Sequence, residues 1–143
     1  MDKEIIIASD HAGVDLKSAI KSYIEQMGVE VEDIGVYDKK SSDYPIIAKE
    51  AAKKAVAEGK KAILICGTGV GMSIAANKVR GVRAVVCSDT TSAKFSRLHN
   101  DCNILCLGAR IIGENLAFDI CKIWLETEFE NGRHKKRIDM IES

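Results

Sequence analysis

A cysteine followed by a glycine-rich turn is the part of the sequence best suited to chemistry. The apolar run at residues 62–65 is typical of a buried strand, and Cys66 stands at its carboxyl end. Three glycines within residues 67–71 then predict a turn into a helix. A helix amino terminus carries about half a positive charge and unpaired N–H groups, so it favours an anion. The pattern predicts an ionisable thiol that acts as a base or nucleophile, rather than a cysteine that only packs.

Other reactive side chains stand next to predicted strands. Asp10 and His11 follow the first strand, Asp89 the fourth and Arg110 the fifth. Because the carboxyl ends of parallel strands share one edge of a sheet, we expect these side chains to gather beside Cys66. His99 comes just before the fifth strand. The set combines bases, an acid and a cation, which are the parts needed to move protons on a small anionic substrate.

Each of these residues also has a simpler interpretation. Asp10 could cap the first helix, a role compatible with chemistry, and His11 could be a solvated residue of its first turn. His99 could be a surface loop histidine, and Arg110 could neutralise a helix end. Arg133 and Arg137 lie one turn apart in the last predicted helix, so they suit either a solvated face or bidentate binding of phosphate.

The elements that would position these side chains alternate along the chain. Strands are predicted at residues 5–8, 29–34, 61–66, 82–87 and 103–107, with helices between them and a basic helix at 133–141. The second strand alternates in polarity, which is typical of an edge strand. We expect the second helix to begin at Asp43-Tyr44-Pro45 and the helix after the glycine turn to close near Gly81. The pattern predicts one α/β domain over residues 1–143, a Rossmann-like three-layer α/β/α sandwich with a five-stranded parallel sheet plus the C-terminal helix.

Composition excludes several classes of partner. Lys plus Arg and Asp plus Glu both number 21, so no net charge attracts nucleic acid or an anionic membrane. We find no signal peptide and no apolar run near the ~18 residues of a membrane span. The 5 cysteines, an odd number, favour a reduced cytoplasm over a disulfide framework. Cys102 and Cys106 lack further ligands at zinc spacing, so no metal is predicted.

Three phosphate-binding motifs fail at the glycine turn. A dinucleotide fingerprint starting at Gly67 would need glycine where Met72 stands, although Asp89 falls about where a ribose-binding acid belongs. A Walker loop would need Gly-Lys-Ser/Thr, which the sequence lacks. A Cys-x5-Arg phosphatase loop would need arginine at position 72.

Taken together, the motifs resemble the type B ribose-5-phosphate isomerases and the related galactose-6-phosphate isomerase subunits. The resemblance extends from the first strand to the last helix. The matching pieces are Ser9-Asp10-His11, Asp43-Tyr44-Pro45, Ile65-Cys66-Gly67-Thr68-Gly69-Val70-Gly71, Ala75-Ala76-Asn77-Lys78, Gly81-Val82-Arg83-Ala84, His99-Asn100, Gly108-Ala109-Arg110 and Gly132-Arg133-His134-x-x-Arg137.

The resemblance implies interconversion of an aldose phosphate and a ketose phosphate through a cis-enediolate, with no metal and no cofactor. Cys66 would be the base, and His99, helped by Asp10 and Thr68, would open the sugar ring. The remaining implied roles divide into an oxyanion site at Gly67, Thr68, Gly69, Val70 and Gly71, phosphate contacts from His11, Arg110, Arg133 and Arg137, and sugar contacts from Asn100 and Tyr44. It also implies the strand order 2-1-3-5-4 and a homodimer or tetramer whose sites are shared, so that His99 or Arg110 serves the partner's Cys66.

Two alternatives stay open at this point. The first is an isomerase of a six-carbon sugar phosphate, either galactose 6-phosphate or allose 6-phosphate, on the same fold. The second is a nucleotide- or phosphate-binding module in which Cys66 is inert.

Overall fold

Five parallel strands form one sheet in the order β2-β1-β3-β5-β4. The computed structural model describes all 143 residues, from Met1 to Ser143. The strands are β1 (Glu4–Ser9), β2 (Glu30–Asp33), β3 (Lys61–Cys66), β4 (Ala84–Val86) and β5 (Ile104–Gly108). The order is the one that the family resemblance implies.

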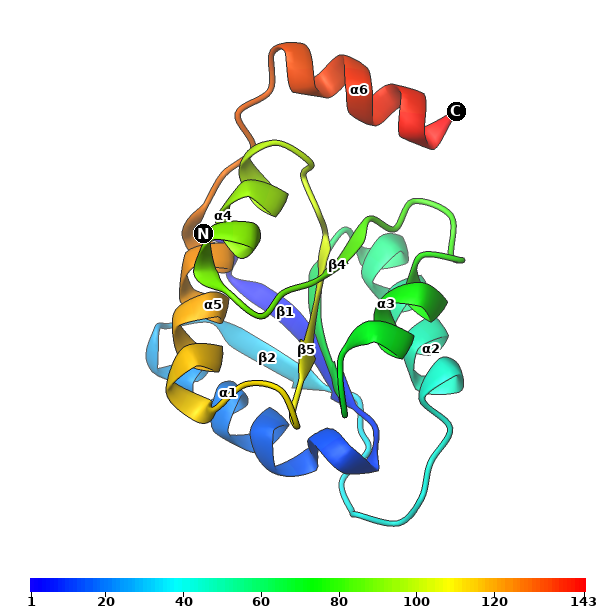
Figure 1. Cartoon of the computed structure of the whole chain (residues 1–143), viewed down its shortest axis with the longest axis vertical. Helices are drawn as coiled ribbons and strands as arrows, with labels where there is room; N and C mark the ends of the chain where they lie inside the picture. Colours follow the sequence, from blue (N-terminus) through cyan, green and yellow to red (C-terminus); the bar gives the residue numbers. More distant parts are fainter.

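Helices cover both faces of this sheet (Figure 1). They are α1 (Val14–Gln26), α2 (Tyr44–Glu58), α3 (Val70–Ala76), α4 (Thr90–Leu98), α5 (Glu114–Glu126) and α6 (Arg133–Glu142), with a single 3-10 turn, η1 (His11–Gly13), after β1. Helices α1, α4 and α5 lie on one face and α2 and α3 on the other, while α6 lies beyond one end of the sheet. The predicted three-layer α/β/α sandwich with a C-terminal helix is confirmed.

The central strand β3 contributes to two separate apolar cores. Ile63 and Ile65 are buried among residues of α1 and α5, whereas Leu64 and Cys66 are buried among residues of α2 and α3. Fully burying an Ile or Leu side chain contributes about 1.5–3 kcal/mol, so a strand buried on both faces reads as a continuous apolar run. This packing fixes Cys66 at the carboxyl end of the middle strand.

Two predicted boundaries are wrong around Asn77. Helix α3 ends at Ala76 rather than near Gly81, and β4 has 3 residues where six were expected. The Asn77 side chain accepts a hydrogen bond from the Ala84 N–H at 2.8 Å and donates one to the Ala84 carbonyl at 3.0 Å. The Asn77 side chain thus takes the place of a neighbouring strand at this sheet edge.

The other local signals behave as expected. Asp43 precedes α2, Pro45 lies in its first turn, and Gly59 ends it with a left-handed φ of 64°. Strand β2 is an edge strand. All five cysteines are free thiols. None of the helices combines the length and the hydropathy that crossing a bilayer requires.

Candidate active site

The sulfur of Cys66 contacts the backbone of the glycine turn. Its Sγ accepts a hydrogen bond from the Gly69 N–H at an N···S distance of 3.1 Å, and the residue is 4% exposed. The sulfur thus lies against the backbone N–H groups at the start of α3. The expected placement of the thiol against backbone amides is confirmed.

Two further amides of this turn are left without a protein acceptor. The first intrahelical bond of α3 runs from the Ser73 N–H to the Gly69 carbonyl at 3.1 Å, and the Val70 N–H donates to Thr68 Oγ1 at 3.3 Å. The N–H groups of Gly71 and Met72 precede that first bond and have no partner, as is usual in a first helical turn. They can therefore donate to an oxyanion on a bound molecule.

Close backbone contacts explain why the turn needs glycine. Gly69 has a φ of +81°, and a Cβ there would lie 2.8 Å from Val86 Cγ2 and 2.9 Å from the carbonyl carbon of Leu107. A Cβ at Gly108 would lie 2.5 Å from the carbonyl oxygen of Thr68. The turn is thus packed directly onto the end of β5, which fixes the amides beside Cys66.

Asp10 directly follows β1, the neighbour of the strand β3 that ends at Cys66. The β1–β3 register pairs Ser9 with Ile65, and the Asp10 N–H continues this ladder by donating to the Ile65 carbonyl at 3.1 Å. The Asp10 carboxylate accepts from the Ala12 N–H at 2.9 Å, so it also caps η1. Both expected roles of Asp10 are compatible with this buried position, because the cap leaves further carboxylate lone pairs free.

His11 is oriented by a serine from a distant loop. The Ser42 N–H donates to His11 Nδ1 at 3.1 Å, and the His11 N–H donates to Ser42 Oγ at 3.0 Å. Because Nδ1 is an acceptor, the neutral ring carries its proton on Nε2, which suits a donor to an anion. Sequence reasoning missed Ser42, since nothing in the polar loop distinguishes it from Ser41.

Tyr44 and Arg110 flank the glycine turn. A Cβ at Gly71 would come within 2.4 Å of Tyr44 Cε1, so the tyrosine ring packs directly against the turn. A Cβ at Gly67 would lie 3.6 Å from Arg110 Cδ, so this exposed arginine covers the other side of the turn. We call this group the carboxyl-edge half-site; its members are Asp10, His11, Tyr44, Cys66, Gly67, Thr68, Gly69, Val70, Gly71 and Arg110.

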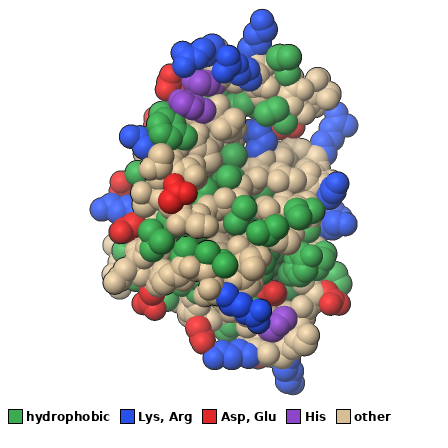
Figure 2. Space-filling view, in the orientation of Figure 1, with side chains coloured by type: hydrophobic (Ala, Val, Ile, Leu, Met, Phe, Trp, Pro, Cys, Tyr) green, Lys and Arg blue, Asp and Glu red, His purple; other side chains and the backbone are tan.

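The remaining predicted residues lie at the opposite edge of the sheet. We call His99, Asn100, Arg133 and Arg137 the amino-edge half-site. Strands β3 and β5 pair from Ala62 with Ile104 to Cys66 with Gly108. The four residue steps from one level to the other span about 13 Å at ~3.3 Å each, and His99 precedes Ile104. Figure 2 accordingly shows histidines at two opposite ends of the molecule. His99 therefore cannot act on a substrate held by the same chain's Cys66.

His99 is supported by His134 of α6 and by Glu130, which precedes this helix. Its ring stacks on that of His134 with centroids 4.2 Å apart and 13° between the planes. Glu130 lies 4.0 Å from His99 Nε2 and 3.7 Å from His134 Nε2. Burial and the neighbouring His99 lower the pKa of His134, so the stacked pair is not doubly charged near neutral pH. Glu130 was missed from the sequence, although it lies four residues before His134.

His99, Glu130 and His134 form the one group of side chains in the structure that could hold a metal ion. Their ligand atoms lie within 4.8 Å of one another. However, the ring planes of His99 and His134 are nearly parallel, so their in-plane lone pairs do not converge on one point. The arrangement fits a stacked pair better than a zinc site.

Comparison with known proteins assigns the chain to a family. Residues 5–141 match the ribose/galactose isomerase family. The chain belongs to this family. Ribose-5-phosphate isomerase B of Escherichia coli is 48% identical over 141 residues, covering 97% of this chain and 94% of the relative.

Solved structures agree with the family assignment. The ribose 5-phosphate isomerase of Thermotoga maritima is 46% identical with a TM-score of 0.95, covering 99% of each chain. Ribose-5-phosphate isomerase B of Mycoplasma genitalium, solved with bound ribulose 5-phosphate, is 39% identical with a TM-score of 0.93, covering 97% of this chain and 93% of that one. As a member of the ribose/galactose isomerase family, the chain is an isomerase.

Asp89, which falls where a ribose-binding acid would stand, makes its hydrogen bonds at the start of α4. The Asp89 carboxylate accepts hydrogen bonds from the Ser92 N–H at 2.6 Å and the Ser92 hydroxyl at 2.9 Å, and so caps α4. These bonds lower the pKa of Asp89. Asp89 therefore serves as the N-cap of α4.

The other thiols of this isomerase are structural. Burial raises the pKa of Cys87 to about 12 and of Cys102 to about 11, and it raises the pKa of Cys106 and Cys121 well above the ordinary range. All four stay protonated at neutral pH, so none of them is suited to act as a base.

The cavities of a single chain do not enclose Cys66. The largest, of about 650 Å³, is lined by Asn100, Arg83 and Glu142 at the amino edge. The carboxyl-edge half-site lies outside all five cavities. Of the two half-sites, only the amino-edge half-site borders a cavity, through Asn100.

Proposed function

We propose that this enzyme interconverts ribose 5-phosphate and ribulose 5-phosphate through a cis-enediolate, with Cys66 as the base. The observation that carries the proposal is the Cys66 sulfur, bonded by Gly69 N–H beside two unpaired amides. The likeness to ribose-5-phosphate isomerase B of E. coli supports the choice of a pentose phosphate.

The chemistry follows from the carboxyl-edge half-site. The Cys66 thiolate takes the proton from C2 of the open-chain aldose, and the negative charge moves to O1. Gly71 and Met72 N–H groups stabilise that oxyanion, a contribution of about 2.7–4 kcal/mol per donor in comparable sites. The hydroxyl proton of O2 then moves to O1, and Cys66 returns its proton to C1 as the C2 carbonyl forms, which gives the ketose. Substrate and product are isomers, so no electrons enter or leave.

We propose further that two subunits share each site. His99 would open the sugar ring and Arg133 and Arg137 would bind the phosphate at the partner's Cys66, with His11 and Arg110 assisting from the carboxyl edge. Proton transfer needs heavy atoms ~2.6–3.2 Å apart, and the edges of one chain are about 13 Å apart along the strands. A homodimer satisfies this requirement, and two such dimers would form a tetramer.

The first test separates the base from the ring-opening group. Ribulose 5-phosphate cannot form a five-membered ring, because O5 carries the phosphate, so exchange of its C1 proton with D₂O needs only the base. We expect Cys66→Ala to lower both the turnover rate and the rate of proton exchange by a factor of about 10²–10⁴. His99→Ala should lose turnover of ribose 5-phosphate but keep proton exchange on ribulose 5-phosphate. Cys121→Ala is the matched thiol control. Full exchange by Cys66→Ala would show that the base is another group.

The second test examines sharing. Neither Cys66→Ala nor His99→Ala should be active alone, but a mixed dimer contains one site with both residues intact. Random mixing of the two chains should restore about one quarter of wild-type activity. No recovery after verified mixing would show that sites are not shared.

The alternative substrate class is a six-carbon aldose phosphate. Comparing kcat/KM for ribose 5-phosphate with that for allose 6-phosphate and galactose 6-phosphate decides between them. We expect the pentose to be preferred. The five free thiols fit a reducing compartment, so we propose that the enzyme works in the cytoplasm.

A further inference from the structure

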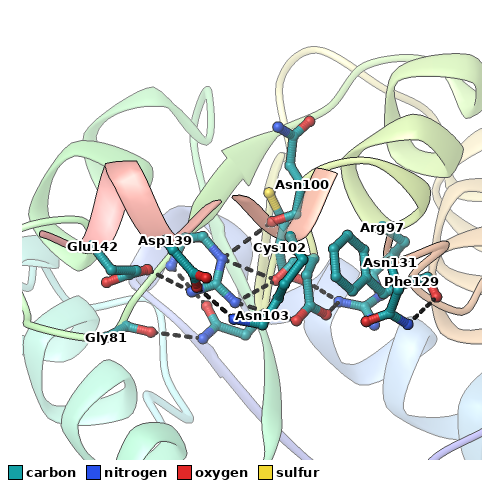
Figure 3. Close-up of polar contacts among 12 residues, drawn as sticks. Gly81, Arg97, Asn100, Cys102, Asn103, Phe129, Asn131, Asp139 and Glu142 are labelled. Atoms are coloured by element: carbon teal, nitrogen blue, oxygen red, sulfur yellow. Dashed lines mark hydrogen bonds and ion pairs between the residues drawn. The ribbon is translucent and has the colours of Figure 1, made fainter. Parts of the chain in front are cut away.

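Arg83 bridges the two parts of the amino-edge half-site. Figure 3 labels two of the residues that it bonds, Asn100 and Glu142. It precedes β4, and its guanidinium lies between the loop after α4, which carries His99 and Asn100, and α6, which carries Arg133 and Arg137. We propose that Arg83 is a positioning residue that fixes the sugar-contacting loop relative to the phosphate-binding helix. The proposal rests on the proposed function and assigns a role to a residue outside it.

The contacts of Arg83 use the whole guanidinium fork. Nε donates to the Asn100 carbonyl at 3.1 Å and to the Asp101 carbonyl at 3.2 Å, and Nη2 donates to the Asp101 carbonyl at 2.9 Å. Nη1 donates to Glu142 Oε1 in the last turn of α6. A planar fork can bond two backbone carbonyls and a carboxylate at once, which lysine cannot do.

The loop depends on such contacts because its backbone turns sharply. Asp101 has a φ of 46°, a left-handed conformation uncommon outside glycine. A second arginine holds it from the other side, since Arg97 Nη1 donates to Asp101 Oδ1 at 2.9 Å and to the Cys102 carbonyl at 2.7 Å. Arg83 and Arg97 together determine where the preceding Asn100 and His99 lie.

Helix α6 has few other anchors. Only His134 and Ile138 of its ten residues are buried, and Met140 and Ile141 are 68% and 63% exposed. The first turn is held by the stack of His134 on His99, while the far end is bonded through Glu142 to Arg83. Because a sugar phosphate must reach both parts of the half-site, a change in their separation would act on substrate binding.

The experiment compares Arg83→Gln, Arg83→Lys and Glu142→Gln with Arg80→Gln as the charge-matched control. Arg80 is exposed and lines the same cavity, but it makes none of these bonds. Steady-state kinetics on ribose 5-phosphate and thermal melting are measured for each. Glu142→Gln removes only the α6 end of the bridge, so it is informative even if Arg83→Gln does not fold.

We expect Glu142→Gln to raise KM about tenfold with little change in kcat, because it loosens the phosphate-binding helix and leaves the loop in place. Arg83→Gln should raise KM and lower kcat, and Arg83→Lys should recover KM but not kcat, since it restores the ion pair without the carbonyl fork. Arg80→Gln should match the wild type.

Two results would overturn the positioning role. One is an unchanged KM in Glu142→Gln and Arg83→Gln, and the other is an equal rise in Arg80→Gln, which would indicate general attraction of an anion. An inactive wild-type enzyme in the same assay would instead refute the proposed function, and the positioning role with it.

Discussion

The substitution Gly71→Ala should strongly lower catalytic activity without lowering the stability of the fold. An ideal Cβ at position 71 would lie 2.4 Å from Tyr44 Cε1 and 2.6 Å from Cζ. Ordinary carbon contacts lie at ~3.5–4.0 Å, so the tyrosine ring must retreat by about 1 Å. A misplacement of ~1 Å at a reacting centre can lose about 10² in rate, so we expect a loss of about 10² in kcat/KM.

Folding should tolerate this change. Position 71 lies in the first turn of α3, where alanine is favoured over glycine by up to about 1 kcal/mol, and the Tyr44 ring is 39% exposed and free to swing outward. The melting temperature measured by circular dichroism should stay the same or rise. Gly113→Ala, where an added Cβ meets nothing within 4 Å, is the control expected to keep full activity.

A double-mutant cycle makes the prediction refutable. If the loss comes from the displaced ring, Gly71→Ala should cost little more in a Tyr44→Ala background, because the space is then empty. The reasoning fails if Gly71→Ala retains wild-type kcat/KM, or if its cost is undiminished when Tyr44 is absent.

Three further predictions concern thiols, pH and the core. Iodoacetamide at about pH 8 should label Cys66 before Cys87 or Cys102, because burial raises the pKa of Cys87 to about 12 and of Cys102 to about 11. Mass spectrometry of the labelled peptides reports the order of labelling. Faster labelling of Cys87 than of Cys66 would contradict the prediction. Hydrogen bonds lower the pKa of Asp89, so its carboxylate stabilises the folded state above the pKa of the unfolded chain and loses this effect as the pH falls through the folded pKa. Asp89→Asn should therefore reduce the fall in melting temperature with acidification below about pH 4. An unchanged fall in melting temperature would count against this role of Asp89. Trp124→Ala should lower the free energy of unfolding by about 3–5 kcal/mol in urea, since this side chain is fully buried, and a loss below about 1 kcal/mol would mean that the core refills.

Sequence patterns predicted the sheet and helices well because burial on two faces leaves apolar runs such as that before Cys66. The predicted ends of α3 and β4 were wrong, in a region where a side chain, rather than another backbone segment, forms hydrogen bonds with a strand. Asn77 bonds both backbone groups of Ala84, and no periodicity reports that contact. The carboxyl-edge half-site was predictable, since strand ends gather reactive residues at one edge. Ser42 was not, because its partner His11 is 31 positions away.

The division of the amino-edge residues from Cys66 follows from strand direction. A residue just before a parallel strand lies at the opposite edge from one just after it, so the position of His99 was implicit in the order of elements. The tie from Arg83 to Glu142 was not implicit, because 59 positions separate the two side chains.

The wide separation of Cys66 and His99 within one fold has a consequence for the enzyme at low abundance. If two subunits share each site as we propose, a subunit that dissociates keeps its hydrophobic interior and loses its catalysis, so specific activity should decline on dilution well before any spectroscopic sign of unfolding. Turnover would then report how often subunits meet, and a cell making few copies would have less enzyme than its copy number suggests.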